Sequence, residues 1–126
     1  MTDFFLSPEQ QMLKDMTRNF AEKELAPGVI ERDQFSKFPK QQIKKMGELG
    51  LMGVMVPKEW GGSGLNTASY VLAIEEIAAV ELAASTIMSV NNSLVCQVLL
   101  DWGNDDQKNK YLNEHSSSYS TYLEDP

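Results

Sequence analysis

Residues 56–65 read VPKEWGGSGL and place three glycines within four residues, between segments whose apolar positions follow helical spacing. Such glycines can present backbone N–H groups to a phosphate, or they can form a tight connection between two helices. A dinucleotide fingerprint needs a strand before its glycines, but here the preceding segment is broken by Gly53 and ends at Pro57. A P-loop needs Lys-Ser or Lys-Thr after its last glycine, whereas Leu65-Asn66 stands here. The stretch therefore predicts a structural connection between helices.

Two helices are predicted before this connection. Residues 7–10 have the pattern of a capping box with proline in the first turn, and the helix that follows ends or kinks at Pro27-Gly28. Its apolar positions are Met12, Leu13, Met16, Phe20 and Leu25. Pro39 opens the second helix, and Gly50 is a candidate left-handed cap at its end. Its apolar positions are Ile43, Met46 and Leu49.

Three helices are predicted after the connection. Asn66 or Thr67 caps the first, which we expect to extend to about Ala84. Its inward positions are Val71, Ile74, Ile77 and Ala78, and its polar side carries Glu75, Glu76 and Glu81. The second has the clearest apolar face and is closed by Gly103. That face consists of Ile87, Val90, Leu94, Val98 and Trp102. A further capping pattern at residues 104–107 opens a last helix with Tyr111 and Leu112.

Together these patterns predict an all-α fold, an up-and-down helical bundle in one domain over residues 1–114. Residues 115–126 have no apolar period and are expected to form a disordered tail. The chain has 126 residues, of which 42% are hydrophobic, and this suffices for one independent core.

Composition argues against several classes of partner. A formal charge of −7 disfavours nucleic acid and anionic membranes. No apolar run approaches the roughly 20 residues that span a bilayer, so no membrane partner is expected. The N-terminal residues lack the features of a secretion or organelle signal, which favours a cytoplasmic protein; a mature mitochondrial matrix protein would look the same.

Local patterns predict no metal site and no catalytic residue. The single cysteine, Cys96, lies in the most apolar helix and is expected to be a small core residue. The single histidine, His115, cannot supply the Glu-x-x-His pairs of a di-iron bundle. Glu75 and Glu76 are adjacent and therefore diverge on a helix instead of forming a carboxylate pair.

Five segments in order nevertheless resemble one family. They are FAEKELAP (20–27), FP followed by KKMGELGLMGVMVPKEWGGSGL (44–65), YVLAIEEIA (70–78), MSVNNSL (88–94) and GNDDQKNKYL (103–112). Over about residues 3–112 the chain resembles the N-terminal helical domain of acyl-CoA dehydrogenases, and MSVNNSL is especially similar to the short-chain, butyryl-CoA type.

This resemblance implies a flavoenzyme of three parts: this helical domain, a middle β domain and a C-terminal helical domain. Such enzymes bind FAD, remove an α-proton with a glutamate base, transfer a β-hydride to the flavin to give a trans-2-enoyl-CoA, and pass electrons to an electron-transferring flavoprotein. The family's main flavin contacts and its base belong to the other two parts. After Leu112 the sequence departs from the family, and residues 123–126, LEDP, are at best a faint echo of its flavin-binding motif. We therefore expect no bound FAD and no turnover by this chain alone.

The resemblance also places three residues at the far end of the acyl-chain pocket, namely Ser89, Val90 and Leu94. A branched residue at Val90 would shorten the pocket and favour short acyl chains. Packing in the bundle core explains Val90 and Leu94 equally well, so both interpretations stay open. The alternative function is a truncated or stand-alone helical interaction domain without activity. In either case, apolar surface left uncovered by missing domains predicts self-association.

Overall fold

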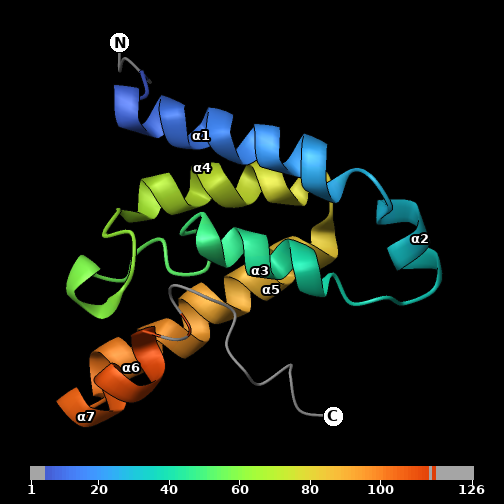
Figure 1. Ribbon diagram of the computed structural model, residues 1–126. Helices are drawn as coiled ribbons and strands as arrows, with labels where there is room; N and C mark the ends of the chain where they lie inside the picture. The colour runs from blue at the N-terminus through green and yellow to red at the C-terminus, as the bar shows by residue number, and fades with distance from the viewer. Residues whose placement is uncertain (1–4, 114, 116–126) are drawn as a thin grey trace.

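Helices form all the regular structure of residues 5–113 and 115, the residues that the computed structural model describes (Figure 1). In chain order they are α1 (Pro8–Phe20), η1 (Ala21–Leu25), α2 (Val29–Gln34), α3 (Lys40–Glu48), η2 (Lys58–Trp60), α4 (Thr67–Ala78), α5 (Leu82–Ser89), η3 (Val90–Cys96), α6 (Gln97–Trp102), α7 (Asp105–Gln107) and η4 (Lys108–Leu112). The segments η1, η3 and η4 are π-helical, and η2 is a 3₁₀ turn. The predicted all-α bundle is confirmed. Apart from His115, the expected disordered tail lies outside the described residues.

The predicted helix starts are confirmed by their caps. The Gln10 amide donates to Ser7 Oγ at 3.1 Å, and the Ser7 amide donates to Gln10 Oε1 at 3.0 Å, which closes the capping box. Asn66 caps α4 by accepting from the Ser69 amide, and Asn104 and Gln107 form a second capping box. Each cap satisfies N–H groups that have no partner within the helix.

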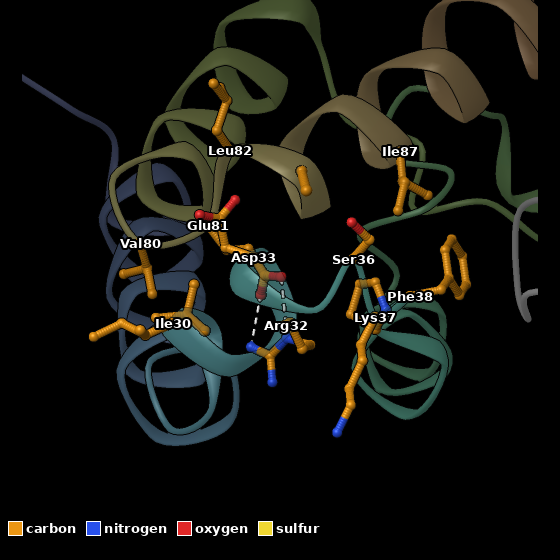
Figure 2. Close-up of a pocket in the computed structure, with 13 residues that line it drawn as sticks. Ile30, Arg32, Asp33, Ser36, Lys37, Phe38, Val80, Glu81, Leu82 and Ile87 are labelled. Carbon is orange, nitrogen blue, oxygen red and sulfur yellow. Dashed lines mark hydrogen bonds and ion pairs between the residues drawn. The ribbon is translucent and has the colours of Figure 1, made fainter.

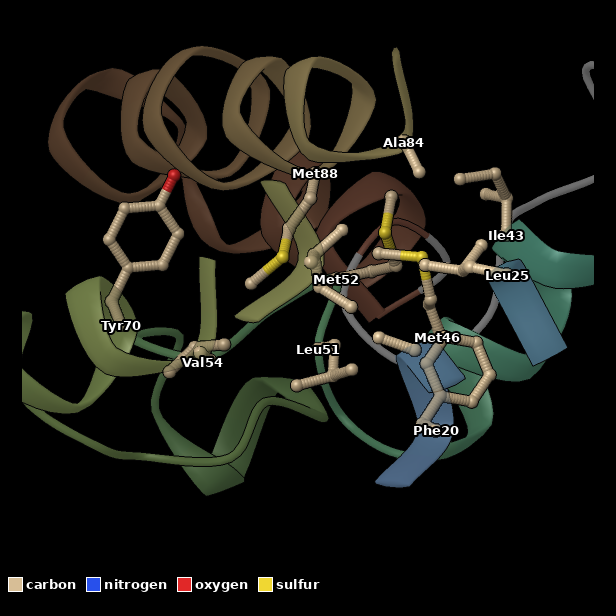
Figure 3. Packing of buried hydrophobic residues seen from close by; sticks show 13 residues of the cluster. Phe20, Leu25, Ile43, Met46, Leu51, Met52, Val54, Tyr70, Ala84 and Met88 are labelled. Carbon is tan, nitrogen blue, oxygen red and sulfur yellow. The ribbon is translucent and has the colours of Figure 1, made fainter. Parts of the chain in front are cut away.

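One apolar core joins the first two thirds of the chain. In Figure 1 helix α1 lies along α4, with α3 beside them and α5 passing below. The buried side chains between these elements include Phe20, Leu25, Ile43, Met46, Leu51, Met52, Val54, Tyr70, Ile77 and Met88 (Figure 3). A smaller cluster consists of Val56, Cys96 at the end of η3 and Leu112 at the end of η4. The predicted core role of Cys96 is confirmed, and burial raises the pKa of its thiol to about 12.

The helix expected from Thr67 to Ala84 is instead two helices. α4 ends at Ala78 and α5 begins at Leu82, with Glu81 in an extended conformation between them. No glycine or proline marks this break. At the break the Glu81 carboxylate accepts from Arg32 Nε at 3.1 Å and from Arg32 Nη2 at 2.7 Å.

The expected polar side of α4 is also wrong. Glu76 is buried and accepts two hydrogen bonds from Arg18 of α1, at 2.8 and 2.9 Å. Val71, which was expected to face inward, is exposed. Glu76 and Glu81 therefore form ion pairs with Arg18 of α1 and Arg32 of α2, whereas Glu75 does lie on the exposed side.

The helix with the clearest apolar pattern buries the face opposite to the one predicted. Leu82–Trp102 is continuous through α5, η3 and α6 and ends before Gly103 as predicted. Its buried residues are Ala84, Ser85, Met88, Asn91, Asn92 and Cys96. The predicted core residues Val90, Leu94, Val98 and Trp102 are all exposed. The periodicity identified a real apolar face, but the core takes the opposite face.

We predict that Glu81→Gln destabilises the chain by about 3 kcal/mol, because it leaves the largely buried Arg32 guanidinium without its counter-charge. The control is Glu31→Gln, which removes the exposed pair with Lys37 and should leave the midpoint unchanged. Urea unfolding followed by circular dichroism measures both. Equal midpoints for the two variants would contradict the structural role of the Arg32–Glu81 pair.

Candidate functional site

The three residues expected to line an acyl pocket lie where α5 passes into the π-helical segment η3. Ser89 ends α5, while Val90 and Leu94 belong to η3. Ser89 and Val90 line a shallow groove of about 390 Å³ between α4 and α5. The other lining residues are Ile74, Glu75, Ala78, Ser85 and Thr86. Leu94 lies beyond the groove, one turn further along the same helix.

Packing in the core does not account for Val90 and Leu94. Their side chains are 50% and 56% exposed, so the alternative of a purely structural role within this chain is wrong. Ser89 is half-buried at the edge of the groove. Val90 and Leu94 therefore form an exposed, branched apolar surface on η3.

Two adjacent asparagines hold η3 in place, and sequence analysis missed both of them. Asn92 accepts from the Val54 amide at 2.8 Å and donates to the Leu51 and Met88 carbonyls at 3.0 and 2.9 Å. Asn91 donates to the Met52 carbonyl at 2.7 Å. Both side chains are buried, and no buried side-chain nitrogen or oxygen of the described residues lacks a hydrogen-bond partner. They tie η3 to the segment that leads into the glycine-rich connection.

A signal for these residues was present in the sequence. A pair of amides in the middle of an apolar helix must find partners if it is buried, because an unbonded buried amide costs about 1–3 kcal/mol. Helical periodicity treats Asn91 and Asn92 as polar positions and so assigns them to the exposed face. The π-helical turn brings both adjacent residues to the inward face.

The glycine-rich connection is a closed structural turn, as predicted. The amides of Gly61, Gly62, Ser63, Gly64 and Leu65 all donate to carbonyls of this chain, at 2.8–3.2 Å. A Cβ at Gly62 would overlap the Val56 carbonyl, and Gly61 and Gly64 have positive φ. No N–H group of these five residues is left for a phosphate.

Other chemistry is sparse in the described part of the chain. Among those residues there is no group of three or more His, Cys, Asp or Glu that could hold a metal ion. By length and composition alone, Leu82–Trp102 could cross a membrane, with a mean hydropathy of 1.3 and 33% of the window buried in this chain. Core helices of soluble proteins pass the same criterion, so the expectation of no membrane partner stays a prediction.

The helical fold and the half-exposed apolar side chains of η3 describe one helical domain with an uncovered apolar face. The model of the acyl-CoA dehydrogenase N-terminal domain matches residues 7–118. The chain therefore belongs to the acyl-CoA dehydrogenase N-terminal domain family.

Similar proteins agree with this assignment. A short-chain specific acyl-CoA dehydrogenase of Clostridium acetobutylicum is 40% identical over 87% of this chain and 29% of that protein. Butyryl-CoA dehydrogenase from Megasphaera elsdenii has a TM-score of 0.84 and 33% identity, covering 92% of this chain and 31% of the other. A chain solved in work on the electron transferring flavoprotein of Acidaminococcus fermentans and flavin-based electron bifurcation reaches 0.89 at 43% identity, covering 93% and 31%. The chain thus spans less than a third of the length of these relatives.

We predict that Asn92→Ala lowers the free energy of unfolding by about 3 kcal/mol, because the buried Val54 amide and Leu51 carbonyl lose their partner. Thr86→Ala is the control at an exposed residue of the same helix, whose hydroxyl donates to the Leu82 carbonyl, and it should change the free energy of unfolding by less than about 0.5 kcal/mol. Urea denaturation of both variants gives the comparison. A loss below that of the control would show that the asparagine bonds add nothing to stability.

Proposed function

We propose that this chain is the N-terminal part of a flavin-dependent acyl-CoA dehydrogenase that converts short-chain acyl-CoA to trans-2-enoyl-CoA. In this role Val90 and Leu94 form the far wall of the acyl pocket, with Ser89 at its edge. The observation that carries the proposal is the half-exposed apolar wall on η3, held against the core by buried asparagines. Acyl-CoA and an electron-transferring flavoprotein are the partners that this function requires.

The wall suits a short chain because of its shape. Val90 is branched at Cβ and is fixed on a helix, so it cannot swing away from a longer ligand as an unbranched side chain could. Its helix is anchored on the inward side at two consecutive positions. The wall is therefore rigid, which a pocket that measures chain length needs.

We propose further that this chain alone neither binds FAD nor turns over substrate. A flavin pyrophosphate needs free N–H donors or cationic side chains. The amides of residues 61–65 donate to carbonyls of the chain itself, and the guanidinium groups of Arg18 and Arg32 are bonded to Glu76 and Glu81. Neither the glycine-rich connection nor the two arginines are therefore available to a flavin pyrophosphate.

We expect a titration of the purified chain with FAD to leave flavin fluorescence unchanged, and we expect no turnover of butyryl-CoA with FAD and an artificial electron acceptor. A flavin-only sample is the control. Stoichiometric quenching that co-elutes with the protein in gel filtration, or turnover above the control, would contradict this expectation.

The pocket wall is tested in a complete enzyme. We would replace the matching segment of the Clostridium acetobutylicum relative by residues 7–113 of this chain. The chimera should oxidise butyryl-CoA. Val90→Ala should raise the ratio of kcat/KM for hexanoyl-CoA over butyryl-CoA about 10-fold, since one or two methylene groups in a pocket are worth about 1–3 kcal/mol. Val71→Ala, which removes the same atoms from an exposed position on α4, should leave the ratio unchanged. An equal ratio in the two variants would show that Val90 does not line the acyl pocket.

A second function is favoured by the same exposed face. A helix with large apolar side chains in solvent is an interaction surface, so the chain can act as a stand-alone helical interaction domain without catalytic activity. In this function the apolar face is covered by self-association. The two proposals differ in whether further domains complete the site.

A further inference from the structure

The largest exposed apolar feature of the helix Leu82–Trp102 is a row of five side chains, which we name the apolar stripe. It consists of Leu82 (72% exposed), Val90 (50%), Leu94 (56%), Val98 (53%) and Trp102 (85%). The exposed, polar Thr86 separates Leu82 from Val90, and the other four side chains follow one another at every fourth residue. Large apolar side chains clustered in solvent are typical of an interface. The only charged residue in this helix is Asp101, so most of the stripe is bordered by small or uncharged side chains.

The π-helical segment gives the stripe its direction. Four-residue spacing drifts around a regular α-helix, which has 3.6 residues per turn. The π-helical segment η3 (Val90–Cys96) bonds to the fifth residue instead of the fourth and so holds more residues in each turn, which offsets the drift. From Val90 to Trp102 the stripe therefore runs nearly parallel to the helix axis. Such a row favours packing at a shallow crossing angle, about 20°.

We propose that a second copy of this chain covers the apolar stripe, with the two Leu82–Trp102 helices antiparallel about a two-fold axis near Asn92. The inference rests on the second proposed function, in which no further domains complete the site, and specifies the surface and register of the self-association. Val90 and Leu94 then contact the second copy instead of an acyl chain. The two-fold axis makes the contact self-complementary, as closed dimers require. Val90 of each copy then lies against Leu94 of the other, and Trp102 lies near Leu82 of the other.

The area is sufficient for a dimer. The five exposed side chains offer roughly 600 Å² per copy, of which Trp102 alone supplies about 200 Å², so a dimer would bury roughly 1,200 Å². This value lies at the lower limit of specific, stable interfaces. Contacts beside the stripe would add to it.

In the antiparallel register the indole ring of Trp102 lies near a cavity of the other copy. At the start of α5 the structure has an open cavity of about 600 Å³, and Leu82, Ala83 and Ile87 form one of its sides. Figure 2 shows Ile30 and Phe38 around the same space, and both side chains are largely exposed. Asp33 and Ser36 also line the cavity and offer oxygen atoms to the indole N–H, which a buried tryptophan needs.

Charge favours the antiparallel register over the parallel one. Asp101, Asp105 and Asp106 lie at the Trp102 end, so parallel helices would bring six carboxylates together. The antiparallel register separates the two acidic ends by the length of the helix, roughly 30 Å, which exceeds the Debye length of about 10 Å at 0.1 M salt. The cavity at the opposite end contains Arg32, Asp33, Lys37 and Glu81, two cations and two anions, so no net charge opposes the acidic end.

Sedimentation velocity over a concentration series tests the surface. We expect the wild-type chain to dimerise and Leu94→Lys, which places two ammonium groups near the two-fold axis, to weaken the dimer at least about 100-fold. Met12→Lys is the matched control, because Met12 is an equally apolar, exposed helical residue on α1. If Leu94→Lys changes the circular dichroism spectrum, Val98→Lys on the same stripe replaces it.

The register has its own readout. In a Trp60→Phe background, Trp102 is the single tryptophan, and its emission should shift to shorter wavelength as the dimer forms. Leu82→Asp, at the edge of the cavity, should weaken the dimer and abolish this shift. Dimers in which Trp102 emission stays that of an exposed indole would overturn the register while leaving self-association intact.

The remaining outcomes overturn the proposal itself. If the chain stays monomeric at all concentrations, both the contact through the apolar stripe and the proposed self-association are wrong. A dimer that Met12→Lys weakens as much as Leu94→Lys uses another surface. A monomer that binds phosphatidylcholine vesicles, with loss of binding in Leu94→Lys, assigns the stripe to a lipid surface. None of these results depends on acyl-CoA binding, so they are separate from the test of the pocket wall.

Discussion

The carboxamide of Asn92 is the contact on which the arrangement of the two halves depends. It accepts one hydrogen bond from Val54 and donates two, to Leu51 and to Met88, so all its bonding capacity but one lone pair is used inside the protein. The partners Leu51 and Val54 lie in an irregular segment that has no helix to satisfy its backbone groups. Without Asn92 these buried groups would have no partner, and the segment would lose the hydrogen bonds that hold it against the helix Leu82–Trp102.

The position of this segment in turn fixes the glycine-rich connection. Gly53 and Val54 offer their carbonyls to the Ser63 and Leu65 amides, and the Gly64 amide bonds back to Val56. The connection therefore packs against the segment that Asn92 holds in position. The outward side of the same helix carries Val90 and Leu94. One polar anchor on the inner face thus determines where the candidate pocket wall stands.

Most of the fold could be predicted from the sequence because caps and glycines act locally. Ser7 with Gln10, Asn66, and Asn104 with Gln107 mark helix starts through bonds within four residues. Helix faces were harder to predict, because periodicity locates an apolar row without saying what covers it. The inward face of Leu82–Trp102 contains Asn91 and Asn92, whose partners are 38 to 41 residues away, and a single sequence holds no record of such distances. The break between α4 and α5 was likewise not predicted, and there Glu81 pairs with Arg32, 49 residues earlier in the chain. Motif resemblance placed the residues of the candidate wall; their exposure emerged only from the structure.

The long reach of the asparagine bonds has a consequence for the order of folding. α1 and α4 acquire their caps from neighbouring residues, so these helices can form early and transiently. The bonds of Asn92 to Leu51 and Val54 form only after a loop of about 40 residues has closed, which carries an entropic cost that local helices do not have. We therefore expect the glycine-rich connection to become ordered last, and the Val54 amide to exchange its hydrogen through a local opening that leaves the α1–α4 pair intact.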